Sequence, residues 1–479
     1  MFTKFGQLYL FTFCQLAAYA AANDMGSMAM DNEGRLHINA NDLIIHNTSF
    51  RGVMDQLNAL KQQVLARNQQ IAQLEERLQN LTACAASEHK FNSTEVGKLV
   101  ASDGAASQFF GSAVAATDGT VVVGATGDRG QGSSSGSVYV FEKNSNGQYE
   151  QVSKLVASDG AAQDFFGVAV AATENMVVVG ASVDDNVRGK DSGSVYVFEK
   201  NSTGQYEQAS KLVPSDGAAE DQFGHAVAVV GSMIVVGARS DDNKGMNSGS
   251  VYMFEKNSAG QYEQVDMLMA SDGSASDRFG SALAATDGIV VVGSWTDDDG
   301  ANSGSVYVFE KDSTGQYEQV IKLVASDGAA NDHFGMTVAV TAGGVVVVGM
   351  PQDDDKGSNS GSAYVFEKNS TGQYEQVSKL VASDGAADNR FGVGVAATTS
   401  MVLVGADHFG EHAQSGVVYV FEKNSTGQYV QVSKLVASDG ASTDRFGHAL
   451  AATDGMVVVG ANVDDHAKGT NAGSAYVFE

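Results

Sequence analysis

Residues 446–461 read FGHALAATDGMVVVGA, and similar stretches recur through most of the chain. The first half, from Phe446 to Ala452, consists mainly of small and apolar residues, and the second half, from Met456 to Ala461, is continuously apolar. A Thr-Asp-Gly link at 453–455 joins the halves, and Asp and Gly suit the positive φ angles of a tight hairpin turn. The stretch therefore predicts two adjacent antiparallel β-strands.

This hairpin belongs to a longer unit that occurs seven times. Each unit carries a Ser-Asp-Gly element, at steps of 55 to 57 residues, with its aspartate at Asp103, Asp159, Asp216, Asp272, Asp327, Asp384 and Asp439. An acidic loop follows the hairpin, then an apolar stretch such as Gly193–Glu199 and a more polar one such as Gln205–Val213. Four strand-like stretches in a period near 56 residues are typical of a propeller blade. The sequence predicts an all-β, seven-bladed β-propeller with four-stranded blades.

The two ends of the repeat region complement each other. The sequence stops at Glu479, directly after the third stretch of the last unit, and residues 95–101 resemble a fourth stretch placed before the first unit. We expect this N-terminal strand to complete the seventh blade and close the ring. Because strand direction alternates, the acidic loops and the Ser-Asp-Gly links are then expected on one face, and the remaining turns on the other.

Three short motifs recur in this order: Phe-Gly, Gly-Ala and Gly-x-Val-Tyr-Val-Phe. The Phe-Gly pairs begin at Phe110, Phe166, Phe223, Phe279, Phe334, Phe391 and Phe446. The pattern resembles the FG-GAP repeat of integrin α-subunit propellers and of secreted FG-GAP proteins, which implies the same propeller fold. The integrin calcium loop between the first two strands has no counterpart here, because the Thr-Asp-Gly link leaves no room for it. Calcium binding of the integrin kind is therefore not expected.

The first hundred residues predict a different organisation. A basic start, a short apolar stretch and Ala18-Tyr19-Ala20 predict a signal peptide over residues 1–20, and a permanent membrane anchor is the alternative. Residues 21–49 are read as a linker. Apolar residues at two heptad positions predict a coiled-coil stalk over 50–85, forming a homodimer or homotrimer, with one amphipathic helix packed on its own domain as the alternative. The propeller is assigned to residues 86–479.

Charge and cysteine content limit the partners. The chain has 29 basic and 57 acidic residues among 479, a net charge of −28, which repels nucleic acids and anionic lipid surfaces. Neither is expected as a partner, and no membrane insertion is expected after signal removal. With Cys14 in the signal peptide, Cys84 is left to form an interchain disulfide or to remain an inert thiol. Six sequons predict glycosylation in a secreted eukaryotic protein, at Asn47, Asn80, Asn92, Asn201, Asn369 and Asn424.

The acidic loops supply the candidate metal ligands. Paired or tripled aspartates stand at Asp184, Asp185, Asp241, Asp242, Asp297, Asp298, Asp299, Asp353, Asp354, Asp355, Asp464 and Asp465. Their oxygens suit Ca²⁺, which takes six to eight such ligands. The other interpretation is that these aspartates accept hydrogen bonds from their own loop backbone. No other cofactor is expected.

Positions that differ between near-identical repeats are candidates for ligand binding. The residues flanking Phe-Gly vary from unit to unit, and their arginine and histidine members are the candidates: Arg278, His333, Arg390, Arg445, His225 and His448. In a closed propeller these positions surround the mouth of the ring, where they either bind a ligand or vary because packing imposes little on them. A loop with His408, Glu411 and His412 is a weaker metal candidate.

The sequence therefore favours a secreted, multivalent adhesion or recognition protein that binds extracellular proteins or glycans through the propeller face. Motifs of hydrolases, metalloproteases and phosphate-binding loops are absent from the sequence, so no enzymatic activity is expected. Two alternatives are an extracellular propeller hydrolase or lyase acting on polysaccharide, and a structural component of a cell wall or matrix.

Overall fold

The structure is a computed structural model that describes residues 28–30, 36–38, 93–297, 302–408 and 415–479. The chain divides into two compact units, residues 1–90 and 91–479. In the first unit, strand β1 (Met28–Met30) pairs antiparallel with β2 (Leu36–Ile38). The predicted signal peptide and coiled coil, with Cys84, Asn47, Asn80 and Asn92, lie outside the described residues. Over the described residues, no helix has the length and apolar character of a membrane span.

In the second unit, the described residues form seven antiparallel four-stranded sheets, which we call blades 1 to 7. Blade 1 contains β4 (Phe110–Thr117), β5 (Thr120–Ala125), β6 (Ser137–Lys143) and β7 (Tyr149–Leu155). Blade 2 contains β8 (Ala169–Thr173), β9 (Met176–Ala181), β10 (Ser194–Lys200) and β11 (Tyr206–Leu212). Blade 3 contains β12 (Phe223–Val230), β13 (Met233–Ala238), β14 (Ser250–Lys256) and β15 (Tyr262–Leu268). Blade 4 contains β16 (Ala282–Thr286), β17 (Ile289–Ser294), β18 (Ser305–Lys311) and β19 (Tyr317–Leu323).

The remaining blades follow the same order. Blade 5 contains β20 (Thr337–Val340), β21 (Val346–Met350), β22 (Ser362–Lys368) and β23 (Tyr374–Leu380). Blade 6 contains β24 (Phe391–Ala397), β25 (Met401–Ala406), β26 (Val417–Lys423) and β27 (Tyr429–Leu435). Blade 7 contains β28 (Ala449–Thr453), β29 (Met456–Ala461), β30 (Ser474–Phe478) and β3 (Glu95–Leu99). The prediction of an all-β, seven-bladed propeller is confirmed.

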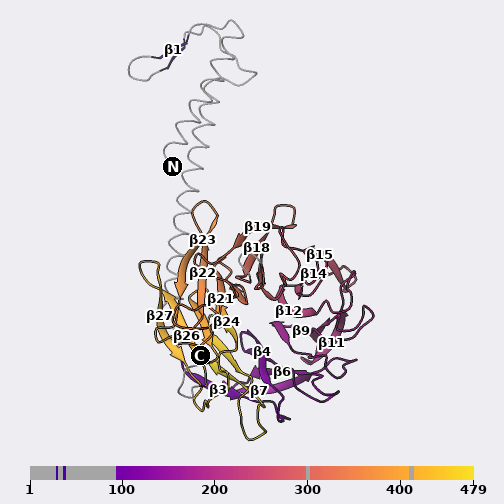
Figure 1. Cartoon of the computed structure of the whole chain (residues 1–479). Coiled ribbons are helices and arrows are strands. Elements are labelled where there is room, and N and C mark those ends of the chain that lie inside the picture. The colour runs from indigo at the N-terminus through magenta and orange to yellow at the C-terminus, as the bar shows by residue number, and fades with distance from the viewer. Residues whose placement is uncertain (1–27, 31–35, 39–92, 298–301, 409–414) are drawn as a thin grey trace. The chain divides into compact units, whose positions relative to one another are not determined.

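The first strand of each blade lines the centre of a ring (Figure 1). Each first strand contacts the first strands of both neighbouring blades, in the circular order β4, β8, β12, β16, β20, β24, β28 and again β4. Small residues suit this crowded position, and the sequence supplies alanines there, for example in AVAAT of β8 and ALAAT of β16.

The seventh sheet combines both ends of the second unit. Strand β3 pairs antiparallel with β30, with Leu99 opposite Ala475 and Glu95 opposite Phe478. The carboxylate of Glu479 then accepts hydrogen bonds from blade 1, from Lys143 Nζ at 2.5 Å and Tyr149 Oη at 2.7 Å. A strand from one end of the unit therefore completes the sheet built from the other end.

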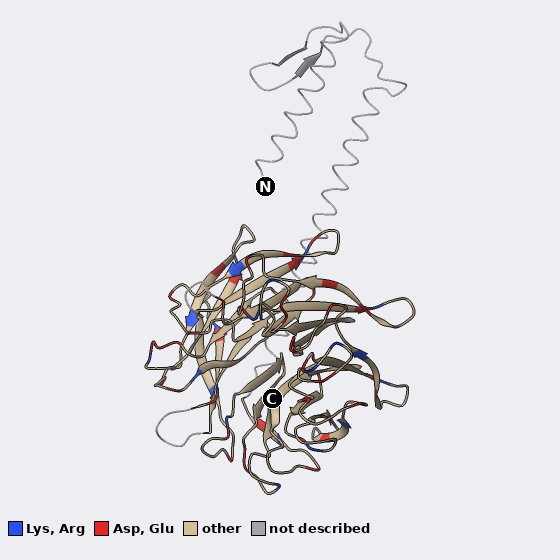
Figure 2. Cartoon of the chain, turned by 45° about the vertical axis from the view of Figure 1, so that its right-hand side comes forward, with Lys and Arg blue, Asp and Glu red and all other residues tan. Residues whose placement is uncertain are grey.

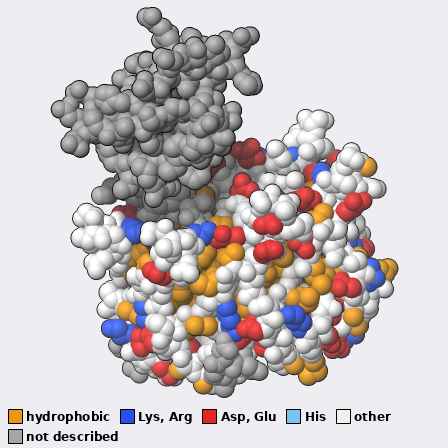
Figure 3. Space-filling model, turned by 90° about the horizontal axis from the view of Figure 1, so that it is seen from above, with side chains coloured by type: hydrophobic (Ala, Val, Ile, Leu, Met, Phe, Trp, Pro, Cys, Tyr) orange, Lys and Arg blue, Asp and Glu red, His pale blue; other side chains and the backbone are white. Residues whose placement is uncertain are grey.

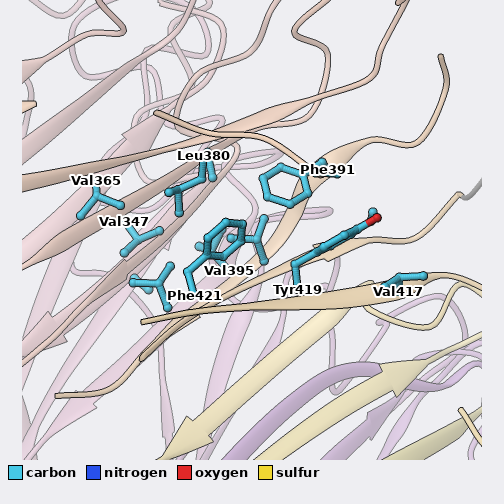
Figure 4. Packing of buried hydrophobic residues seen from close by; sticks show 14 residues of the cluster. Val347, Val365, Leu380, Phe391, Val395, Val417, Tyr419 and Phe421 are labelled. Atoms are coloured by element: carbon cyan, nitrogen blue, oxygen red, sulfur yellow. The ribbon is translucent and has the colours of Figure 1, made fainter. Parts of the chain in front are cut away.

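The core consists of seven apolar layers, one between each pair of neighbouring blades. Second and third strands are buried on both sides because each sheet lies between two others. Between blades 5 and 6, the ring of Phe391 packs edge-on against Tyr419 and Phe421, with centroids 5.3 and 6.1 Å away (Figure 4). The Phe of every Phe-Gly pair makes the corresponding contacts, so it joins the first strand to the third.

The glycines of the Phe-Gly and Gly-Ala motifs meet where neighbouring blades approach most closely. A Cβ atom on Gly460 of blade 7 would lie 2.2 Å from the carbonyl oxygen of Gly111 in blade 1. Equivalent contacts join Gly124 to Gly167, Gly180 to Gly224, Gly237 to Gly280, Gly293 to Gly335, Gly349 to Gly392 and Gly405 to Gly447. The Phe-Gly and Gly-Ala motifs therefore meet the same steric need, close backbone contact between neighbouring blades. The contact is repeated around the ring, including between blades 7 and 1.

The fourth strands form the outer rim and are less polar than the sequence suggested. Most of their glutamates are exposed and most of their lysines are half-buried. A valine at one shared position is exposed in six of the seven strands: Val96, Val152, Val265, Val320, Val377 and Val432. Blade 2 has Ala209 at this position. Strand β27 exposes Val430 as well. Exposed hydrophobic side chains lie between charged ones in Figure 3.

Candidate functional site

Two sets of loops lie together on one face of the propeller. The backbone N–H of Gln163, before β8, donates to Ser133 O in the loop between β5 and β6, at 2.8 Å. Ser107 and Glu220 donate in the same way to Thr470 O and Lys190 O of the preceding blades. We call this side, made of the loops between second and third strands and those leading into each first strand, the acidic-loop face. These contacts confirm the prediction that the two sets of loops share one face. Acidic residues occur in many of the loops (Figure 2).

Each blade has a partly buried polar network beneath this face. In blade 1, Tyr139 Oη donates to Asp103 at 2.7 Å or to Asp128 at 2.9 Å. The ammonium of Lys154 lies 2.6 Å from Asp103 and 2.9 Å from Asp128. Burial alone would raise the pKa of Asp128, but Lys154 and nearby N–H donors outweigh it and lower the pKa to about 2. The lysine thus supplies the positive charge that the two carboxylates need.

The candidate calcium ligands take part in these networks. The network lysine of blades 2, 4, 5 and 7 lies 2.8–3.1 Å from Asp184, Asp297, Asp353 and Asp464, respectively. In blade 3 Met267 takes the place of the lysine, and Asp241 accepts hydrogen bonds from Ser250 and Tyr252. Asp355 pairs with Lys379 at 2.5 Å.

The second aspartates cap their own loops. Asp185, Asp242, Asp354 and Asp465 accept backbone N–H bonds from residues five or six positions later, at 2.6–2.8 Å. Asp298 and Asp299 lie outside the described residues. No group of three or more potential metal ligands occurs among the residues that the structure describes. Where a lysine nitrogen occupies the position between carboxylates, the residues fit Ca²⁺ poorly, and calcium binding stays a prediction.

A further set of aspartates caps the turns that lead into the first strands. Asp164 Oδ2 accepts the N–H of Ala161 at 2.6 Å, and Asp221 and Asp444 do the same in their blades. All three side chains are buried, and burial, with repulsion from nearby aspartates, raises their pKa values to about 6. In blade 1 an amide fills this position, and Gln108 Oε1 accepts the N–H of Ala105 at 3.2 Å.

We expect the triple variant Asp164→Asn, Asp221→Asn, Asp444→Asn to be more stable than the wild type at pH 8, by about 1 kcal/mol per site. A raised folded-state pKa means that the folded state holds more protons between pH 4 and 6, so the wild type loses stability as pH rises through that window. Asparagine does not ionise, so the variant does not lose this stability as the pH rises. Urea unfolding from pH 4 to 8 measures it: the advantage should shrink as pH falls, and an advantage that is independent of pH would contradict this cause.

The variable positions meet at the start of each innermost strand. The residue before Phe-Gly has a left-handed φ of 52–59° in all seven blades, at Phe109, Phe165, Gln222, Arg278, His333, Arg390 and Arg445. Pairing of Phe223 with Ala238 brings Gln222 next to Arg239, the residue after Gly-Ala. The backbone N–H of His225 donates to Gln222 O at 3.3 Å, which folds a third variable position back toward the first two.

In blades 3 to 5 these positions form what we call the arginine–tryptophan cluster: Gln222, His225, Arg239, Arg278, Trp295 and His333. Arg239 donates from Nε to Gln222 Oε1 at 2.7 Å and from a terminal nitrogen to His225 Nε2 at 3.1 Å. The guanidinium of Arg278 lies 5.2 Å from the centre of the Trp295 ring, and the ring of His333 contacts Trp295 with centroids 4.6 Å apart. The cluster combines two positive charges with one aromatic ring.

Both histidines of this cluster are held neutral. Burial, with Arg239 and Arg278 nearby, lowers the pKa of His225 to about 3. Burial and Arg278 also lower the pKa of His333. Because an arginine can only donate, Nε2 of neutral His225 accepts and the ring proton is on Nδ1.

In blades 6 and 7 the same positions form what we call the Asp407 cluster: Arg390, Asp407, His408 and His448. Asp407 is buried; its Oδ1 lies 2.9 Å from His408 Nδ1 and its Oδ2 lies 3.1 Å from His448 Nδ1. A nitrogen of Arg390 lies 3.8 Å from Oδ1. Burial raises the pKa of Asp407, but the two histidines and Arg390 outweigh it and hold the pKa well below its usual range.

The structure thus brings together five of the six predicted ligand-binding residues, in two clusters. Arg278, His333 and His225 are in one, Arg390 and His448 in the other, and Arg445 joins neither through the contacts of the described residues. The sequence analysis did not assign Arg239, Trp295 or Asp407 to the ligand site, although Asp407 belongs to one of the acidic loops. All three are the residue directly after the Gly-Ala motif. This residue also differs in every blade: Thr126, Ser182, Arg239, Trp295, Pro351, Asp407 and Asn462.

The sequons on the opposite face have a structural role. Asn201 Oδ1 accepts the N–H groups of Thr203 and Gln205, and its amide donates to Glu207 at 2.7 Å. Asn369 and Asn424 cap the same turn in their blades. Asn257, which is in no sequon, does so as well. The turn alone explains these asparagines, and glycosylation stays a prediction.

The family model for the FG-GAP repeat matches residues 93–141, 149–198, 206–254, 262–309, 317–366, 374–421 and 429–478. These seven matches cover most of the chain, and each runs from the fourth strand of one blade to the third strand of the next. The chain belongs to the FG-GAP repeat family, and the resemblance to integrin α-subunit propellers is confirmed. No curated protein matches the sequence.

Proposed function

We propose that this protein is a secreted recognition or adhesion protein whose propeller binds extracellular ligands through the acidic-loop face. One observation carries the proposal: the residues that break the sevenfold repetition converge in the arginine–tryptophan and Asp407 clusters. Other residues around the ring perform the same structural task in nearly every blade. Packing that is the same in every blade does not require Arg278 beside Trp295. We therefore attribute these differences between blades to ligand binding.

The proposal extends to the N-terminal region. A coiled-coil stalk would present two or three propellers together, so that weak individual contacts add up through effective concentration. Avidity would then compensate for a site of modest size. Extracellular location and oligomerisation are parts of this proposal.

Capture on glycan arrays and from extracellular protein extracts tests it. The full chain is compared with two variants: Arg278→Gln with Asp407→Asn on the acidic-loop face, and Val320→Ser with Val377→Ser on the outer rim. We expect the wild type and the rim variant to capture the same partner and the first variant to lose it. Equal capture by all three, or capture lost only in the rim variant, would contradict recognition by this face.

One observation supports a second candidate, an extracellular propeller enzyme acting on polysaccharide. The hydrogen bond between Asp407 and His448 Nδ1 orients an imidazole as in carboxylate–histidine pairs that work as general bases. Turnover of labelled polysaccharides that is lost in His448→Gln, and retained in the rim variant, would favour this candidate over pure recognition.

A further inference from the structure

We propose that the arginine–tryptophan cluster binds the oxyanion of an acidic sugar, a carboxylate or sulfate ester carried by a single sugar unit. This inference rests on the proposed function and names the ligand class for one of its two clusters. Three features of the cluster carry it: unneutralised charge, an excess of hydrogen-bond donors, and an aromatic ring beside them.

The first feature is charge without a counter-charge. Among the ion pairs of the described residues, neither Arg239 nor Arg278 has a carboxylate partner, although the chain has a net charge of −28. The network lysines of six blades, such as Lys154, do have one. The close approach of Gly237 to the carbonyl oxygen of Gly280 brings together the segments that carry Arg239 and Arg278. Burial and the charge of Arg278 lower the pKa of Arg239, as expected for two like charges near each other. An anion placed between the two guanidinium groups would relieve this repulsion.

The second feature is the excess of donors. Gln222 uses its oxygen to accept from Arg239, which leaves its amide N–H groups to donate. His225 uses Nε2 to accept, which leaves the proton on Nδ1. Guanidinium groups only donate. Gln222 Oε1 and His225 Nε2 already accept from Arg239, so donors outnumber acceptors in this part of the cluster. A ligand rich in hydrogen-bond acceptors, such as an oxyanion, therefore complements it.

The third feature favours a sugar as the carrier of the anion. Trp295 places an apolar ring beside these donors, and a sugar unit presents both C–H groups and hydroxyls to such a mixture. The surrounding acidic loops repel a long polyanion, whereas a single charge in contact with two arginines is attracted at short range. The site therefore fits one acidic unit on an otherwise neutral glycan.

Trp295 makes the test direct, because it is the only tryptophan in the chain. Its fluorescence is titrated in the full-length protein with methyl glucuronide, its methyl ester, glucose 6-sulfate, inorganic sulfate and a hexapeptide of Asp and Glu. We expect saturable quenching by the glucuronide or the sulfated sugar. Binding of the ester and of inorganic sulfate should be at least tenfold weaker.

Calorimetry then compares the variants. Arg278→Gln and Arg239→Gln should each weaken binding about 10- to 100-fold, the usual worth of a charge-assisted hydrogen bond. Arg445→Gln is the matched control: it has the same position before Phe-Gly and a similar φ, 59° against 55°, but no contact with Trp295 among the described residues. It should bind as the wild type does. Thermal unfolding of each variant shows whether the fold is intact.

Several outcomes would overturn the inference. They are equal binding of the ester, binding of inorganic sulfate as tight as that of the sugars, tighter binding of the acidic peptide, no binding by any probe, and full affinity in both arginine variants. If array capture succeeds while these probes fail, this inference alone is wrong and recognition by the face stands. If capture also fails, the proposed function fails with it.

Discussion

Gly460→Ala is expected to destabilise the propeller by about 3 kcal/mol or more, because its Cβ would meet backbone rather than a flexible side chain. The new atom would lie 2.2 Å from the carbonyl oxygen of Gly111 and 3.3 Å from Ala449 Cβ. Relief requires blades 7 and 1 to separate, and this opens the apolar layer that contains Phe110 and Val458. Urea unfolding followed by circular dichroism measures the loss.

The matched control is Gly455→Ala, in the turn of the same hairpin. Nothing lies within 4 Å of a Cβ at this position, and its φ is not left-handed. This variant should be as stable as the wild type to within about 0.5 kcal/mol. Similar urea midpoints of unfolding for both alanine variants would show that blades 7 and 1 lack the close contact between Gly460 and Gly111.

Deleting residues 93–101 from the full chain is expected to abolish cooperative unfolding of the propeller. The deletion removes β3, exposes the edge of β30 and takes Leu99 out of the layer between blades 7 and 1. An open edge with an uncovered apolar layer promotes association, so the product should elute as aggregate in size-exclusion chromatography.

Restoring the strand elsewhere in the chain separates closure from mere loss of residues. Segment 93–101 is attached after Glu479 through a copy of the Lys-Asp-Ser-Thr-Gly-Gln turn at 311–316 that joins β18 to β19, which keeps the spacing between the two strands. This permuted chain should regain the elution volume of the wild type and a single unfolding transition of the propeller, because the blade then has four strands in the same order. A deletion variant that unfolds as the wild type does would contradict the claim that β3 completes blade 7 and closes the ring.

The repetitive part of this protein could be predicted from its sequence because each blade is determined locally. The period, the Thr-Asp-Gly turns and the apolar second and third stretches give strand order, and the unpaired stretch at 95–101 indicates what joins the ends. The exposed valines of the outer rim were not expected, because the period-2 pattern of Tyr149–Leu155 was outweighed by its polar residues.

The candidate site was predictable only in part. Residues next to Phe-Gly were recognisable because they vary, but Arg239, Trp295 and Asp407 needed the strand register that places the end of the second strand beside the start of the first. The networks of Asp, Tyr and Lys were missed because Asp103 and Lys154 are 51 residues apart and meet only through loop geometry. Paired aspartates in the sequence were compatible both with calcium ligands and with side chains that accept hydrogen bonds from their own loop backbone.

The central claim is that the acidic-loop face recognises the ligand. Hydrogen–deuterium exchange of the full chain, with and without the partner found by capture, tests it most directly. The account predicts slower exchange in the segments around residues 222–225, 278–281 and 333–336 or around 390–393 and 407, and unchanged exchange in the opposite turns at 201–205 and 369–373. Protection confined to those turns or to the outer strands, such as β19 and β23, would contradict it.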